Sequence, residues 1–108
     1  MQDLTTMFAA LGDPTRFSIV ERLLAEGELS AGELQSGFDM SAPAISRHLN
    51  VLRNAGLLDR RAEKQQRIYS IRSDTMQGIS DWVERHRAFW DGSLARLEHA
   101  LMAERDRK

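Results

Sequence analysis

The stretch SAPAISRHLNVLRNAG, residues 41–56, determines how the rest of the sequence is interpreted. It is predicted to form one amphipathic helix that Ser41 caps and that ends at Gly56, since Ser and Gly are favoured at these two ends. No acidic residue lies between Ser41 and Arg53, so the polar side of the helix carries no negative charge. The apolar side chains that predict its buried face are Ile45, Leu49, Leu52 and Ala55.

Three more helices are predicted upstream, at residues 3–11, 14–25 and 31–36. Asp13 caps the second of them, and Ser30 caps the third in a capping box with Glu33. A very short strand is predicted at residues 28–29. The tight turn at residues 38–40 separates two helices and therefore predicts a helix-turn-helix. The second helix is expected to bury Phe17, Ile19, Val20, Leu23 and Leu24.

Downstream of the 41–56 helix the pattern changes. Residues 57–62 and 67–71 are predicted to form two short strands, joined by a hairpin tip at residues 63–66. The tip lacks the Gly or Asn-Gly that favours a two-residue turn, so we expect a longer, mobile loop. A β-hairpin in this place is the wing of a winged helix-turn-helix.

From residue 75 to the end the sequence is predicted to form one helix, kinked at Gly92; two helices are the alternative. Its apolar residues recur every three or four positions, and the winged core needs only part of them. We expect a two-fold interface with a second copy, joined by the first helix; packing on the chain's own first helix is the alternative. The expected interface is Leu4, Met7, Phe8, Leu11, Ile79, Trp82, Val83, His86, Phe89, Trp90, Leu94, Leu97 and Leu101.

These elements predict a mainly α fold with a small β-hairpin, a dimeric winged helix-turn-helix with five helices. Residues 1–108 are expected to form a single domain whose first and last helices dimerise. No stretch approaches the roughly 18 apolar residues of a membrane span, the N-terminus does not resemble a secretory signal, and the sequence has no Cys. We therefore expect a cytoplasmic protein without contact with a membrane and without disulfides.

Charge is segregated along the chain, although the formal net charge is only −1. Residues 1–40 contain two Lys or Arg against seven Asp or Glu, whereas residues 41–72 contain seven against two. Residues 73–108 contain six against seven. Because phosphate binding depends on the local field over one face and not on the total charge, the middle segment predicts a nucleic-acid interface.

The polar face of the 41–56 helix and the basic hairpin form the predicted surface for double-stranded DNA. Arg suits guanine, Asn suits adenine, and Ser suits a base or a phosphate. The hairpin cations are expected to contact the adjacent phosphates. His48 has two interpretations, a half-buried polar residue at the helix edge or a donor to a phosphate or a base. The candidate residues are Ser41, Pro43, Ser46, Arg47, His48, Asn50, Arg60, Arg61, Lys64, Gln65 and Arg67.

Over residues 4–72 the sequence resembles the ArsR family of bacterial winged-helix repressors. The matching stretches, in order, are ALGDPTR at 10–16, ELS at 28–30, SAPAISRHL at 41–49, LRNAGLL at 52–58 and RIYSI at 67–71. The resemblance implies a homodimer that binds an inverted repeat in DNA and leaves it when a ligand arrives.

The sequence departs from the metal-sensing members of that family. Those members carry Cys-x-Cys in the third helix, where residues 33–37 here read ELQSG. Other members use Asp and His ligands on the last helix, with the two His about three turns apart. His86 and His99 are 13 residues apart and would lie on nearly opposite faces of one helix. We therefore expect no metal site and no cofactor.

Three other functions fit the sequence less well. A protein-interaction module, the main alternative, requires neither a carboxylate-free helix nor an Arg-rich wing. RNA binding lacks a stacking platform, since Tyr69 is the only aromatic residue in 41–72. An enzyme is not expected, because we find no Cys, no Gly-rich phosphate loop and no paired carboxylates on one face. The sequence thus predicts a sequence-specific DNA-binding regulator of transcription, a repressor.

Overall fold

A computed structural model of the chain describes residues 3–106, so the domain predicted over residues 1–108 extends two residues past the described part at each end. The contacts divide the chain into two compact units, Met1–Gln77 and Gly78–Lys108. The first contains the helix-turn-helix and the sheet, and the second is helical. No helix between residues 3 and 106 is long and apolar enough to cross a membrane.

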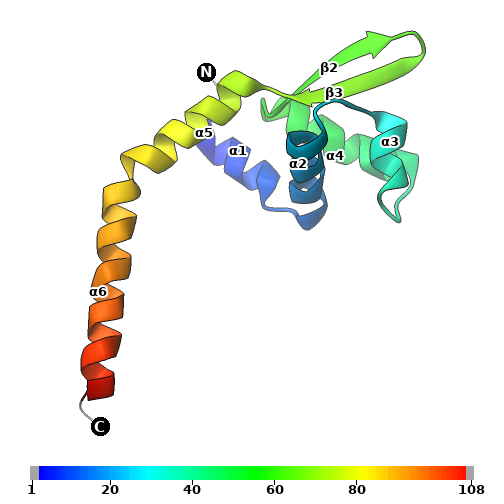
Figure 1. Cartoon of the computed structure of the whole chain (residues 1–108). Helices are drawn as coiled ribbons and strands as arrows, with labels where there is room; N and C mark the ends of the chain where they lie inside the picture. The colour runs from blue at the N-terminus through cyan, green and yellow to red at the C-terminus, as the bar shows by residue number, and fades with distance from the viewer. Residues whose placement is uncertain (1–2, 107–108) are drawn as a thin grey trace. The chain divides into compact units, whose positions relative to one another are not determined.

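Four helices form the body of the first unit (Figure 1): α1 Leu4–Leu11, α2 Pro14–Glu26, α3 Ala31–Ser36 and α4 Ala42–Asn54. The Asp13 carboxylate caps α2 by accepting a hydrogen bond of 3.0 Å from the backbone N–H three residues later. The capping box between Ser30 and Glu33 is formed in both directions at the start of α3. Ser41 Oγ caps α4 in the same way as Asp13 caps α2, at 3.3 Å. The predicted caps of α2, α3 and α4 are confirmed, and α1 begins one residue after its predicted start.

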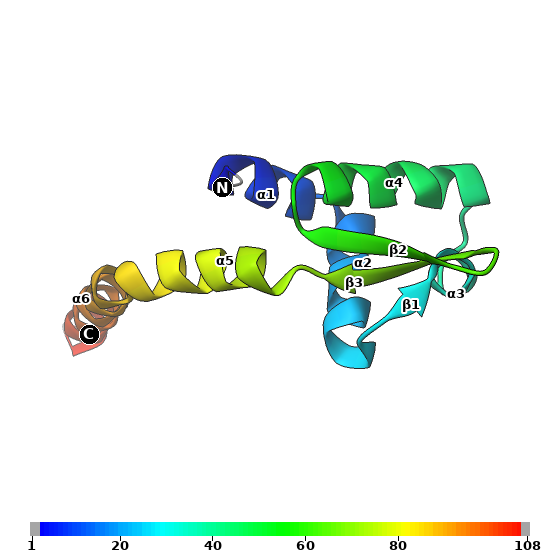
Figure 2. The same cartoon turned by 90° about the horizontal axis from the view of Figure 1, so that it is seen from above.

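A three-stranded antiparallel sheet with the order β1-β3-β2 completes the first unit. Its strands are β1 Leu29–Ser30, β2 Leu58–Glu63 and β3 Gln66–Ile71. The β2–β3 hairpin extends away from the helices (Figure 1), and α4 runs alongside it (Figure 2). The predicted winged helix-turn-helix with its small hairpin is therefore confirmed, and the very short strand predicted at residues 28–29 is present as β1, one residue later.

The tip of the hairpin is shorter than the sequence predicts. Glu63 pairs directly with Gln66, so only Lys64 and Gln65 form the turn. Lys64 adopts a φ of 58°, a left-handed conformation that is unfavourable for residues other than Gly. Six paired positions along each strand hold the turn in place despite this cost. The prediction of a longer loop was wrong because it rested on the turn residues alone.

The core of the first unit lies between its helices and the sheet. The buried face predicted for α4 is confirmed, and Met7, predicted at the dimer interface, is only 3% exposed and belongs to this core. Phe17 and Leu24, predicted to be buried, are 50% and 53% exposed, because residues seven apart share one side of α2 and this side faces away from the core. The fully buried large side chains are Ile19, Leu23, Leu34, Ile45, Leu49, Leu52 and Leu57.

The helix α5, Ser73–Arg85, begins in the first unit and ends in the second. Its first turn is anchored through Thr75, which is 6% exposed and whose hydroxyl donates a hydrogen bond to the carbonyl of Gly56. Gly56 follows the end of α4 with a φ of 83°, which Gly adopts without strain. The start of α5 is therefore tied to the end of α4.

The C-terminal segment forms two helices, since α6, Arg87–Asp106, follows α5 after a break at His86. The His86 backbone N–H donates to the carbonyl of Val83 at 3.1 Å, three residues back. The carbonyl of Trp82, which would accept that N–H in a continuous helix, instead accepts a hydrogen bond of 2.8 Å from His86 Nδ1. The predictions of one final helix and of five helices in all were therefore wrong. Gly92, the predicted kink, lies inside α6.

Candidate nucleic-acid interface

The solvent side of α4 presents the side chains predicted to contact bases. Ser46, Arg47 and Asn50 are exposed, whereas Ile45 and Leu49 on the other side are 2% and 0% exposed. This buried side fixes the rotation of α4 about its own axis and so the direction of its polar side chains. Because α4 contains no Asp or Glu, its exposed side combines hydrogen-bonding groups with positive charge.

The start of α4 is suited to an anion. Ser41 and Pro43 are exposed there, and the Ser41 hydroxyl, which accepts the capping bond, keeps its own proton to donate. Pro43 lies in the first turn, where its missing N–H leaves no unpaired donor. The remaining first-turn N–H groups form the positive end of the helix dipole. Both residues are thus placed where a phosphate oxygen would be favoured.

His48 also lies on α4, but its ring is half-buried and faces the start of α2. The ring Nδ1 is 3.4 Å from Arg16 Nη1 and 3.8 Å from Asp13 Oδ2. The pKa of Asp13 is lowered, chiefly by the hydrogen bond from the backbone N–H of Arg16, so its carboxylate stays negative near neutral pH. This location favours the interpretation of His48 as a half-buried polar residue at the helix edge.

The two faces of the hairpin carry different arginines. Successive side chains along β2 alternate between the faces, so Arg60 and Arg61 point to opposite sides. Arg60 is paired with Tyr69 and lies with it on the face that contains the buried Leu58. Arg67 shares that face, because it precedes Tyr69 by two residues on β3. The predicted phosphate contacts therefore divide between the two faces of the wing.

Arg61 is already engaged by two carboxylates, those of Glu28 and Glu63, each at 2.7 Å. Their hydrogen bonds, first that of Glu63 and then that of Glu28, raise the pKa of Arg61. Its charge is therefore largely balanced within the chain. The cations of α4 and the hairpin that make no ion pair within residues 3–106 are Arg47, Arg53, Arg60, Lys64 and Arg67.

Two residues outside the predicted surface act on it, and sequence reasoning missed both. Glu28 balances Arg61 although the two are 33 positions apart, and Arg16 contacts His48 over 32 positions. Helical and strand periodicity predict which face of an element is buried, but not which charges meet across such distances. The ALGDPTR stretch indicated only the start of α2.

Possible metal ligands do not gather at one point in the described part of the chain. Within residues 3–106 no three His, Asp or Glu side chains are grouped so that they could hold a metal ion. His86 is engaged twice, since its Nδ1 binds the carbonyl of Trp82 and its ring packs on the Trp82 ring with the centroids 4.5 Å apart.

Comparison with known proteins identifies relatives along most of the chain. A family model described as a helix-turn-helix domain matches residues 11–61. The chain is 34% identical over 80 residues to the transcriptional repressor SdpR of Bacillus subtilis, a match that covers 74% of this chain and 88% of SdpR. It is 36% identical over 97 residues to the HTH-type transcriptional regulator Rv2034 of Mycobacterium tuberculosis, covering 90% and 87%. A solved structure, an ArsR-like transcriptional regulator from Rhodococcus sp. RHA1, has 31% identity and a TM-score of 0.69, covering 89% of this chain and 90% of that one.

Proposed function

Because this chain belongs to the ArsR family of helix-turn-helix transcriptional regulators, we propose that it represses transcription by binding an inverted-repeat operator as a homodimer. The family consists of DNA-binding regulators of transcription and not of enzymes. One observation carries the proposal: α4 exposes a polar face free of carboxylates while its opposite side is fixed in the core. A helix held in this way can present the same side chains to every operator half-site.

Base recognition is assigned to the middle of α4. Arg47 is expected to bridge the two major-groove acceptors of a guanine, and Asn50 to pair with an adenine. Ser46 lies beside them on the exposed side and suits a base or a phosphate. Ser41 and Pro43, at the start of the helix, are expected to lie against the phosphate backbone at the edge of the groove.

The wing is assigned to backbone contacts, which position the protein without reading sequence. Arg60 and Arg67 share one face of the hairpin and make no ion pair within the part of the chain that the structure describes. Lys64 and Gln65 form the exposed tip. Arg61 is assigned a smaller share, because Glu28 and Glu63 balance its charge.

A homodimer is required by the geometry of an inverted repeat. Each copy carries one recognition helix, and adjacent major grooves on one side of DNA lie about 34 Å apart. Two copies related by a two-fold axis therefore bind one operator, each reading one half-site. A single copy would read only half of the sequence and would hold it with about half of the contacts.

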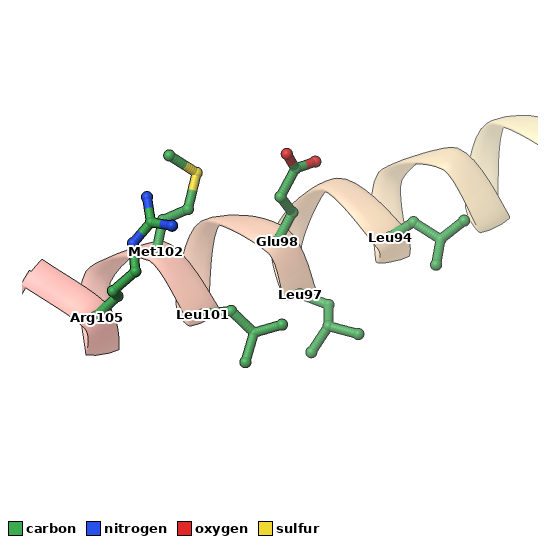
Figure 3. Close-up of a pocket in the computed structure, with 6 residues that line it drawn as sticks. All are labelled: Leu94, Leu97, Glu98, Leu101, Met102 and Arg105. Atoms are coloured by element: carbon green, nitrogen blue, oxygen red, sulfur yellow. The ribbon is translucent and has the colours of Figure 1, made fainter.

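The apolar face of α6 is the proposed centre of the dimer interface. No residue of α6 is buried, and Leu94, Leu97 and Leu101 project to the same side of it (Figure 3). Their exposed fractions are 64%, 56% and 62%, and a continuous apolar surface of this kind is typical of an interaction site. We assign the same interface to Ile79, Trp82, Val83, His86, Phe89 and Trp90 of the second unit and to Leu4, Phe8 and Leu11 of α1.

Repression, as opposed to activation, is supported by the relative SdpR, which is described as a repressor. A bound dimer whose operator overlaps a promoter excludes the polymerase without any further contact. The function therefore needs no surface beyond α4, the wing and the dimer interface.

Selection from a pool of random-sequence DNA duplexes tests the proposal directly. The full-length protein is expected to enrich an inverted repeat whose half-sites lie one helical turn, about 10 base pairs, or a multiple of it apart. The selected site is then placed across a promoter, and transcription is measured with increasing amounts of protein. Enrichment of no sequence, or a rise in transcription instead of a fall, contradicts the proposal. The matched control is Arg47→Ala, which should enrich a repeat degenerate at one position per half-site.

A further inference from the structure

Arg16, at the start of α2, forms a hydrogen bond with the end of α1 and also contacts α4. Its Nε donates a hydrogen bond of 2.6 Å to the carbonyl of Ala10, in the last turn of α1. That carbonyl is one of the four at a helix end that have no partner within the helix. A guanidinium there also interacts favourably with the negative end of the helix dipole. Arg16 thereby ties the start of α2 to the end of α1.

The same guanidinium reaches the DNA-binding helix. Its Nη1 lies 3.4 Å from Nδ1 of His48. Because a guanidinium has only donors, a hydrogen bond between these two groups uses Nδ1 of His48 as its acceptor. His48 Nδ1 is therefore directed into the chain, and the His48 side chain is only 19% exposed.

Asp13 completes the cluster. Its carboxylate accepts the backbone N–H of Arg16 at 3.0 Å, and one of its oxygens lies 3.8 Å from His48 Nδ1. The negative charge of Asp13 offsets the positive charge of Arg16 beside the half-buried ring. Three short-range contacts thus join α1, α2 and α4 at one point.

His48 is also well placed to affect DNA contacts. It follows Arg47 directly and precedes Asn50 by two residues, so a small rotation of α4 at His48 moves both base-reading side chains. The buried leucines hold the opposite side of α4, and a contact at His48 holds its flank. Together the two contacts resist rotation of α4 about its axis.

We infer that Arg16 and His48 are positioning residues, which fix α4 for base recognition without contacting DNA themselves. The inference rests on the DNA-binding function proposed above, and it replaces the prediction that His48 contacts a phosphate or a base.

The experiment measures affinity for the selected operator and for a scrambled duplex over a range of salt concentrations. Arg16→Ala and His48→Ala are expected to lower the ratio of specific to non-specific affinity about tenfold, within the range of couplings between contacting residues. Since neither residue contacts a phosphate, the slope of log K against log salt should stay at the wild-type value. The double variant should have an affinity ratio no lower than that of the more affected single variant. The reason is that both substitutions break the same contact, the one between Arg16 and His48.

Two controls separate positioning from general destabilisation. Arg22→Ala removes another α2 arginine, which bonds Glu26 and the carbonyls of Glu33 and Leu34 but does not reach α4. It is expected to lower thermal stability while leaving the affinity ratio unchanged. His48→Gln restores an acceptor for Arg16 and should recover most of the lost ratio.

Several outcomes overturn the inference. A slope that falls by about 0.9 in Arg16→Ala identifies a phosphate contact, and a loss confined to one base pair in His48→Ala identifies a base contact. A ratio unchanged by His48→Ala removes the positioning role even if Arg16→Ala does not fold. If the wild-type protein selects no operator at all, the proposed function itself fails. If it selects one and the variants have the wild-type affinity ratio, only the inference about Arg16 and His48 fails.

Discussion

The helices α4 and α6 are both amphipathic, yet they bury their apolar faces differently. α4 places Ile45, Leu49 and Leu52 in the core of its own unit, where each is at most 2% exposed. α6 is longer, with 20 residues against 13, and buries none of them. Periodicity therefore predicts that a helix face is to be buried, but not whether the chain itself or a second copy covers it. The contrast makes α4 a part of the fold and, in the assembly proposed above, makes α6 a part of the dimer interface.

The largest effect is expected when the buried side of α4 is cut back. Leu52→Ala should lower the free energy of unfolding by about 2–5 kcal/mol, because it removes a fully buried side chain and leaves a cavity. Its neighbour Val51 is 41% exposed, so Val51→Ala is the matched control and should cost much less. Urea denaturation of both variants measures the difference. Equal losses in the two variants would show that α4 is not held by this side.

The apolar face of α6 should be needed for the contact between two copies and not for the fold of one copy. In the double variant Trp90→Glu/Leu97→Glu the dimer should be lost, because each copy would bring two charges into the apolar interface. Operator affinity should then fall by at least about 100-fold, or roughly 2.7 kcal/mol. The melting temperature of the wild-type protein should rise with its concentration, whereas that of the variant should not.

The control changes the opposite side of the same helix. His99 lies about 160° around the helix from both Leu97 and Leu101, and Ala103 about 120° and 160° from them, so His99→Glu/Ala103→Glu should leave the dimer intact. Sedimentation and a gel shift on the same samples decide the matter. A soluble monomer that binds the whole operator with wild-type affinity contradicts the proposed assembly. The apolar face of α6 would then have a role other than dimerisation.

Features governed by a few neighbouring residues were predictable from the sequence. The caps Asp13, Ser30 and Ser41 and the buried face of α4 depend on residue type and helical spacing, and the structure contains them as predicted. The exposed position of Ser46, Arg47 and Asn50 follows from the same spacing. The fold class could therefore be derived without any knowledge of long-range contacts.

Features that depend on one particular contact, whether local or distant in the sequence, were not predictable. The tight turn at Lys64 is imposed by the strand pairing on both sides of it. The break at His86 arises because its ring takes the carbonyl that its own backbone would use. The ion pair in which Glu28 balances the charge of Arg61 joins residues 33 positions apart. In each case the deciding partner is a specific atom and not a residue pattern.

A smaller effect is expected on the exposed side of α4. Arg47→Ala should weaken operator binding by about 1–3 kcal/mol and relax the base preference at one position per half-site, because it removes a bidentate contact to one base. The free energy of unfolding should change little, since the side chain is exposed. Arg96→Ala on α6, which also removes one exposed arginine, is the control. Equal loss of specificity in both variants would mean that only the total charge matters.

The smallest effect is expected in the wing, where the contrast between groups paired within the chain and groups left free recurs. Arg67 makes no ion pair within residues 3–106, whereas Arg61 makes two. Arg67→Ala should therefore lower the slope of log K against log salt by about 0.9, the value for one lost phosphate contact. Arg61→Ala should lower it by clearly less. Since the two side chains lie on opposite faces of the hairpin, the reverse order would show that the wing turns its other face to the DNA. Arg61 would then have to exchange Glu28 and Glu63 for a phosphate on binding, and Glu28→Gln, which removes one of these partners, should then strengthen binding to any duplex.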